Sequence, residues 1–193
     1  MTGKIFIAGC GALGSQIALH LALPEREFLL VDDEHIGPEN IGTSAYWMAQ
    51  VGAYKAQALA EMLWRKAGAK AVPDTGTLTH ESLLFRGRDR VAEIGLLVDT
   101  FDNAQSRGLL CGLRCPTLHV GVSERGTGMA VWDEEYKLPE DETPRGSNPV
   151  CTHQLGRGLL RWTAAVGAGI AEQFLENGLR RRVIVTADMK ILE

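Results

Sequence analysis

A glycine-rich segment near the amino terminus has the residue types and spacing that suit phosphate binding. It reads G-x-G-x-x-G and lies between a short β-rich run and an apolar helical run. In this pattern the first glycine permits a tight turn, the second lets the backbone approach phosphate, and the third lets helix pack on strand. The N–H groups and dipole of the helix then favour an anion. We expect phosphate to contact Gly9, Gly11, Ala12, Leu13 and Gly14.

Carboxylates follow two of the expected strands, at the ends where ligands bind in open α/β sheets. Asp32 ends the second strand, where a carboxylate can accept hydrogen bonds from ribose hydroxyls. Asp33 beside it is either part of the site or simply solvated. Asp99, Asp102 and Asn103 follow an apolar strand, and a carboxylate there can hold Mg²⁺ against phosphate oxygens.

The glycine loop and Asp32 are equally compatible with NAD and with ATP. Lys55 helps to decide between these two ligands. It begins an amphipathic helix after Gly52, and above a nucleotide its charge would offset charge developing on the phosphates. A lysine combined with an acidic strand end suits a triphosphate with Mg²⁺. We therefore expect Mg-ATP as the ligand.

The elements that must position these residues alternate between strand and helix. Expected strands span 4–8, 27–31, 69–72, 94–98, 117–122, 128–132 and 182–186. Expected helices span 12–23, 54–66, 104–113 and 155–177. The alternation predicts an α/β fold, a Rossmann-like doubly wound and mostly parallel sheet with helices on both faces. We expect one domain over 1–193, with an exposed loop at 133–150 and a return helix and strand in 151–193.

Composition excludes several classes of function. The chain has 193 residues, 45% of them hydrophobic and 23% charged, as in ordinary globular domains. A net charge of −4 gives no basic surplus for nucleic acid. The sequence shows no signal peptide and no apolar run of the roughly 20 residues that span a bilayer. We expect a cytoplasmic protein with reduced thiols at Cys10, Cys111, Cys115 and Cys151.

Four motifs, in this order and spacing, resemble the ThiF/MoeB/HesA family, the bacterial relatives of ubiquitin-activating enzymes. They are GCGALGS at 9–15, VDDEHIGPEN at 31–40, VGAYKA at 51–56, and VDTFDN at 98–103 followed by Arg107. The similarity runs from about residue 4 to about residue 132, and the apolar helix from Leu155 resembles the return helix of the family.

The resemblance implies a chemistry. Family members adenylate the carboxy-terminal carboxylate of a small ubiquitin-like or sulfur-carrier protein, which attacks the α-phosphate of Mg-ATP and releases pyrophosphate. By position, the three glycines would hold phosphate and Asp32 the ribose. Asn40 and Lys55 would contact the phosphates, and Asp102 would bind Mg²⁺, which makes Lys55 and Asp102 the expected catalytic groups. The resemblance also implies a homodimer, and a conjugating enzyme as a further partner.

The chain departs from the family pattern after Asn40. Relatives usually have an arginine and then a glutamine there, whereas residues 41–44 read IGTS. A second arginine, which many relatives supply from a helix before the first strand, has no counterpart either. The alternatives are that Arg65, Arg88 or Arg107 substitutes, that a partner supplies the charge, or that activity is weak. A catalytically degenerate nucleotide-binding subunit and an NAD-dependent oxidoreductase therefore stay open as other functions.

Cysteine and histidine positions argue against a structural zinc ion. The family often carries two C-x-x-C pairs, but here only Cys151 and His153 stand in the corresponding region. Cys111 and Cys115 lie on one expected helix, where packing thiols explain them best. Cys151 is either an ordinary loop residue or a nucleophile that accepts the activated carrier as a thioester. The remaining histidines are interpreted as structural: His20, His35, His80 and His119.

Overall fold

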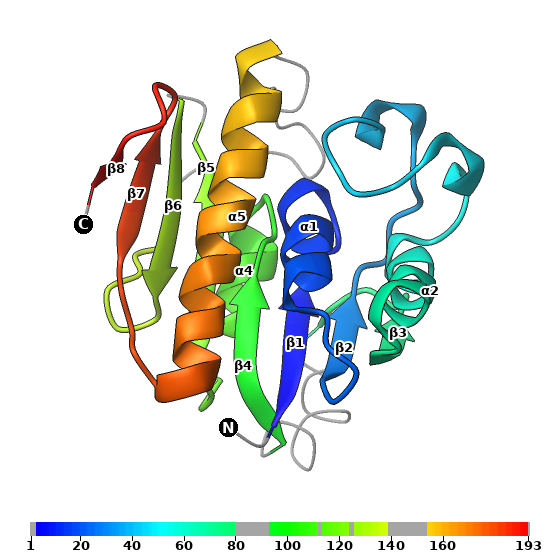
Figure 1. Cartoon of the computed structure of the whole chain (residues 1–193), viewed down its shortest axis with the longest axis horizontal. Helices are drawn as coiled ribbons and strands as arrows, with labels where there is room; N and C mark the ends of the chain where they lie inside the picture. The colour runs from blue at the N-terminus through cyan, green and yellow to red at the C-terminus, as the bar shows by residue number, and fades with distance from the viewer. Residues whose placement is uncertain (1–2, 80–92, 112, 124–125, 139–153, 193) are drawn as a thin grey trace.

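The computed structural model describes residues 3–79, 93–111, 113–123, 126–138 and 154–192. Within these ranges, eight strands form one sheet in the order β3-β2-β1-β4-β5-β6-β7-β8 (Figure 1). The strands are β1 (Lys4–Ala8), β2 (Glu27–Val31), β3 (Lys70–Asp74), β4 (Ile94–Asp99), β5 (Thr117–Val122), β6 (Thr127–Trp132), β7 (Val183–Thr186) and β8 (Ile191–Leu192).

The half of the sheet from β3 to β5 is parallel, and β5 to β8 are antiparallel. In the parallel half, Ala8 at the end of β1 pairs with Val31 at the end of β2 and with Asp99 at the end of β4. The carboxyl ends of these three strands therefore meet at one edge. The loops that carry the glycine motif, Asp32 and Asp102 leave the sheet there.

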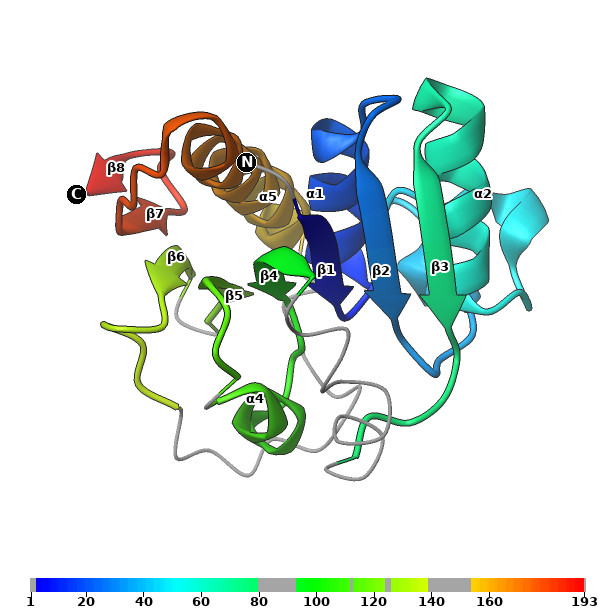
Figure 2. The ribbon, with the colours of Figure 1, turned by 90° about the horizontal axis from the view of Figure 1, so that it is seen from below.

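Helices cover both faces of the sheet, as expected from the sequence. They are α1 (Ala12–Leu21), α2 (Lys55–Ala67), α4 (Ala104–Leu110) and α5 (Gln154–Asn177), with 3-10 turns at Pro38–Asn40 and Met48–Gln50. Figure 2 shows α1, α2 and α5 on one face and α4 on the other. The larger core lies under α1, α2 and α5, and a smaller one lies on the side of α4. None of the described helices is both long and apolar enough to cross a membrane.

Two local expectations from the sequence are wrong. The helix α4 ends at Leu110 instead of continuing to residue 113, and neither Cys111 nor Cys115 lies on it. The short β8 was not expected, because its two exposed residues carry no strand pattern. Within the expected loop at 133–150, Asp133, Glu134 and Glu135 are exposed, and residues 139–150 lie outside the described part. Other positions of interest also lie outside it: His80, Arg88, Cys151 and His153.

Close packing of β6 against α5 gives a test of the fold. A side chain at Gly128 would overlap the buried side chain of Thr163. We expect Gly128→Ala to lower the free energy of unfolding by about 1–3 kcal/mol, as overpacking does. Urea denaturation measures this. Gly169→Ala on the exposed face of α5 is the control, because its methyl group would meet no atom within 4 Å. Equal stabilities of Gly128→Ala and the unchanged protein would contradict this packing.

Candidate functional site

The glycine loop joins β1 to α1, and its three glycines have different surroundings. Gly9 has a φ of +89°, which favours glycine, and its N–H donates to the Val31 carbonyl at 2.9 Å. A side chain at Gly14 would overlap the Gly9 carbonyl oxygen and the Thr100 hydroxyl. Around Gly11 an added Cβ would meet no atom within 4 Å. The fold itself therefore requires Gly9 and Gly14, whereas Gly11 leaves room for a ligand beside the backbone.

The amino terminus of α1 opens at the same edge. No side chain caps it, and its first turn, which includes Ala12 and Leu13, holds no acidic residue. The Ser15 side chain instead turns back, and its hydroxyl donates to the Gly11 carbonyl at 2.6 Å. No carboxylate in that turn therefore offsets the positive end of the helix dipole. Such a terminus favours a bound anion.

Asp32, at the end of β2, is buried against the glycine loop. Its Oδ2 accepts a hydrogen bond from the Cys10 backbone N–H at 2.7 Å, and its Oδ1 accepts one from the Glu34 N–H at 2.9 Å. Burial raises the pKa of Asp32, while the nearby Lys55 ammonium and the two N–H donors act against this rise. Each oxygen keeps a lone pair with which it can accept from a further hydroxyl group.

Lys55 is brought into the same site, although it is distant from Asp32 in sequence. Its Nζ donates to Glu34 Oε2 at 2.5 Å, and its side chain is only 8% exposed. Burial lowers the pKa of Lys55, but Asp32, Glu34 and Asp102 together raise it above the ordinary value. A buried ammonium group that pairs with one carboxylate and feels the charge of two more is well placed to meet the negative charge of a ligand.

The loop after β4 supplies one open carboxylate and one helix cap. Asp102 is exposed, and its Oδ1 accepts from Asn103 Nδ2 at 3.2 Å. The Asn103 Oδ1 accepts from the Ser106 N–H at 2.8 Å and so caps α4. Asp102 therefore faces solvent and its charge acts on Lys55, whereas the Asn103 side chain is engaged within the protein.

Asp99 points into the protein instead of toward this open edge. It is fully buried, and its Oδ2 lies 2.7 Å from His119 Nδ1 and 3.7 Å from Arg107 Nη1. Arg107 also donates to the Phe101 carbonyl at 2.6 Å and to the Tyr136 hydroxyl at 3.1 Å. The Tyr136 ring stacks on His119 with centroids 3.7 Å apart. This buried network fixes the loop that follows β4.

Asn40 and Asp33 make contacts of their own around the site. The Asn40 Oδ1 accepts from the Gly37 N–H at 2.9 Å, which holds the first 3-10 turn. Its side-chain nitrogen donates to none of the described residues, so that the amide keeps a free donor. The Oδ2 of Asp33 accepts a hydrogen bond from the Thr77 hydroxyl at 2.7 Å, in the segment that follows β3.

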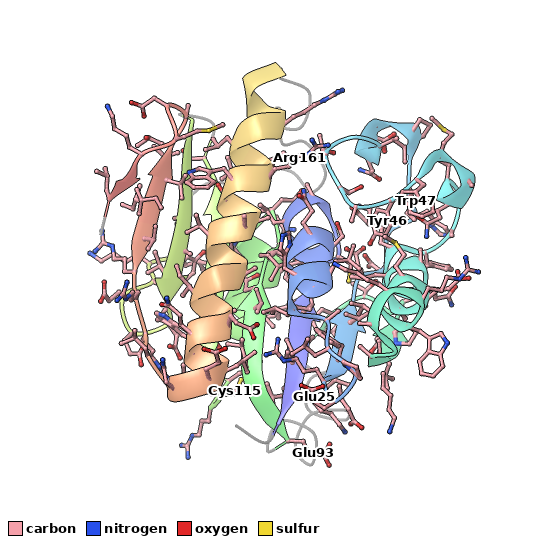
Figure 3. All side chains as sticks on the ribbon, viewed as in Figure 1. Glu25, Tyr46, Trp47, Glu93, Cys115 and Arg161 are labelled. Atoms are coloured by element: carbon pink, nitrogen blue, oxygen red, sulfur yellow. The ribbon has the colours of Figure 1, made fainter. Side chains whose placement is uncertain are left out.

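Tyr46 is a residue of the site that sequence reasoning missed (Figure 3). It is 3% exposed, and its hydroxyl lies 2.6 Å from the Cys10 carbonyl and 3.0 Å from the Lys55 carbonyl. Burial, with the charges of Cys10 and Asp32, raises the pKa of Tyr46 well above its ordinary value. The neutral hydroxyl therefore ties the glycine loop to the start of α2. A single tyrosine in an irregular segment gave no signal of this link.

The remaining expectations from the sequence concern the thiols, a metal ion and the arginines. The free thiols include Cys10, which is fully buried in the glycine loop, and burial raises its pKa well above the ordinary value. Among the described residues, no group of three or more His, Cys, Asp or Glu could hold a metal ion. Arg65 lies on the exposed face of α2 beside Glu61, and Arg107 is buried with Asp99, so neither reaches the open edge.

The tyrosine link generates a stability prediction. Tyr46→Phe removes a hydroxyl that serves two buried carbonyls, and we expect a loss of about 1–3 kcal/mol in the free energy of unfolding. Chemical denaturation measures it. Tyr54→Phe is the matched control, because the Tyr54 ring packs at a tilt against His35 while its hydroxyl bonds to no described residue. If both variants unfold at the same denaturant concentration, the Tyr46 hydroxyl does not contribute to the free energy of unfolding.

Solved structures share this fold at low sequence identity. Escherichia coli MccB with ATP is 14% identical with a TM-score of 0.69, and the match covers 98% of this chain and 62% of that chain. MccB with AMPCPP and selenomethionine MccA is 16% identical, with a TM-score of 0.69 and the same coverage. PaaA is 14% identical with a TM-score of 0.74, again covering 98% and 62%. This chain therefore spans 62% of the length of those proteins.

Sequence comparison identifies the family. None of the curated proteins matches the chain. The model of the ThiF family matches residues 1–175, a span that contains the glycine loop, Asp32, Lys55 and Asp102. Because this match covers most of the sequence and the fold agrees with it, the chain belongs to the ThiF family.

Proposed function

We propose that the protein binds Mg-ATP at the carboxyl edge of its sheet and adenylates the carboxy-terminal carboxylate of a peptide or small protein. One observation carries the proposal. Lys55 is buried beside Asp32 and close to Asp102, at the open amino terminus of α1. A triphosphate with its divalent cation needs a cation, a carboxylate and an anion-binding backbone at one place. Membership of the ThiF family supports the same reaction.

Each group has a role in this proposal. Asp32 accepts hydrogen bonds from ribose hydroxyls, and the glycine loop, Asn40 and Lys55 hold the phosphates. Asp102 is the exposed carboxylate that fits Mg²⁺, which would offset phosphate charge. Asp33, Asp99 and Asn103 are engaged within the protein and act indirectly, by fixing the loops that carry the other groups.

The reaction is a substitution at phosphorus. A carboxylate oxygen attacks the α-phosphorus and forms an acyl-adenylate bond. The bond from the α-phosphorus to the bridging oxygen breaks, and pyrophosphate leaves with the electron pair. No proton has to be transferred, because the nucleophile is already an anion. The protein therefore contributes mainly by positioning the reactants and by stabilising charge.

The polypeptide whose carboxylate is adenylated is proposed from the family and from the structural neighbours. The neighbouring MccB was solved with ATP and with MccA, which supports a polypeptide substrate. We propose that the substrate is a small ubiquitin-like or sulfur-carrier protein. In a further proposed step, the activated carrier is transferred to Cys151 and then to a conjugating enzyme. Trp47 and Met48 are 70% and 64% exposed, and such apolar surface supports a homodimer.

A second candidate function is a nucleotide-binding subunit without turnover. Residues 41–44 favour it, because this segment lies beside the open edge and contains no arginine. ATP–pyrophosphate exchange separates the two candidates. Exchange that depends on a carrier with a free carboxy terminus supports the enzyme. Tight ATP binding with no exchange, even with the correct carrier, supports the subunit. Thermal protection by NAD(H) but not by Mg-ATP would overturn both and favour an oxidoreductase.

Lys55 gives a prediction about affinity. Lys55→Ala removes the buried ammonium that would meet the phosphates and that also acts on the charge of Asp32. We expect the affinity for Mg-ATP to fall about tenfold or more, as the loss of a charged hydrogen bond does. Isothermal titration calorimetry measures it. Lys70→Ala removes an equal charge from the exposed strand β3 and serves as the control. Equal losses in the two variants would show a general charge effect instead.

Gly11 separates binding from folding. The methyl group of Gly11→Ala meets no protein atom within 4 Å, so the melting temperature is expected to stay close to that of the unchanged protein. A phosphate that approaches this backbone would meet the methyl group, and the affinity for Mg-ATP should fall. Thermal melts with and without Mg-ATP measure both effects. Full stabilisation of the variant by Mg-ATP would place the phosphates elsewhere.

A further inference from the structure

The first turns of α5 carry two exposed arginines that face the segment after Asn40. Arg157 and Arg161 lie one helical turn apart, so they share a face of the helix. Arg161 Nη2 donates to the Gly42 carbonyl at 3.2 Å (Figure 3). Arg157 Nη1 lies 3.6 Å from the position that a Cβ on Gly42 would occupy. Both guanidinium groups therefore reach the same short stretch of backbone.

This stretch is fixed on the first turns of α1. Gln16 Nε2 donates to the Thr43 carbonyl at 2.7 Å, and the Ala45 N–H donates to the Ser15 hydroxyl at 3.1 Å. The helices α1 and α5 lie side by side, with their amino termini at the same end of the molecule (Figure 1). The α5 arginines are thus neighbours of the helix terminus that the glycine loop leaves open.

These arginines differ from the other cations near the site in their charge partners among the described residues. Lys55 is paired with Glu34, and Arg107 is paired with Asp99. In the part of the chain that the structure describes, no carboxylate pairs with either arginine of α5. Two adjacent guanidinium groups without a counter-ion form an anion site, because each can donate two parallel hydrogen bonds to phosphoryl oxygens.

The layout also gives the direction of a bound nucleotide. Asp32 ends β2 on one side of α1, and α5 lies on the other side (Figure 1). A nucleotide with its ribose at Asp32 would extend its phosphates across the first turn of α1 toward α5. We propose that Arg157 and Arg161 bind the β- and γ-phosphates of ATP and hold the pyrophosphate as it leaves. This inference rests on the proposed function. It assigns phosphate binding to two arginines of α5, because residues 41–44 contain no arginine.

Binding measurements with three probes test the assignment. The double variant Arg157→Ala/Arg161→Ala is titrated with Mg-ATP, AMP and inorganic tripolyphosphate by calorimetry. We expect about tenfold or greater loss of affinity for Mg-ATP and tripolyphosphate, with AMP affinity unchanged, because AMP lacks the outer phosphates. Arg157→Lys/Arg161→Lys should recover part of the loss, since it keeps charge without the bidentate geometry. Arg65→Ala, an exposed arginine beside Glu61 on α2, is the control and should change nothing.

The possible outcomes separate this inference from the function on which it rests. Unchanged binding of Mg-ATP by a folded double variant would overturn the arginine assignment and leave the proposed function intact. An equal loss for AMP would also overturn it, by indicating a general disturbance of the site. If the unchanged protein binds tripolyphosphate but not Mg-ATP, the anion site is real and the proposed function is wrong. Binding of neither probe would overturn both. Melting temperatures establish that each variant is folded.

Discussion

A buried carboxylate joins the parts of the chain that surround the open end of α1. Asp32 accepts N–H groups from Cys10 and Glu34, and its charge acts on Lys55. Burying such a charge is costly unless donors and a cation offset the lost hydration. The shape of the glycine loop, the end of β2 and the start of α2 are therefore coupled through one side chain. Tyr46 adds a second link between the same elements, with a neutral hydroxyl.

The arrangement separates cations that maintain the fold from cations that remain free for a ligand. Arg107 is enclosed with Asp99 and positions the loop after β4. Lys55 is intermediate, because its carboxylate partner Glu34 is 41% exposed and can give way to a competing anion. The arginines of α5 lie at the other extreme, because they are exposed and pair with no carboxylate of the described residues. The positive charge most available to a ligand thus lies on α5, on the side of α1 where the outer phosphates would lie in the proposed orientation.

Local patterns in the sequence were sufficient for much of the fold. The strands at 4–8 and 27–31 match expectation because each is a short apolar run with clear turn residues on both sides. The direction of a side chain at a strand end was not predictable. Asp99 and Asp102 are close in sequence, yet Asp99 turns inward because His119 on β5 and Arg107 on α4 receive it. The Tyr46 and Arg161 contacts join distant segments and likewise leave no local pattern.

The buried thiol of Cys10 provides a way to follow the opening of the glycine loop in solution. Thiolate is the reactive form of cysteine, and burial disfavours it here by raising the pKa. Alkylating reagents and peroxide can then modify this sulfur only after the segment between β1 and α1 opens. Its labelling rate would therefore report the frequency of local opening. Any ligand that holds the segment closed would slow that labelling, and so would reveal its own occupancy without a fluorescent or radioactive tag.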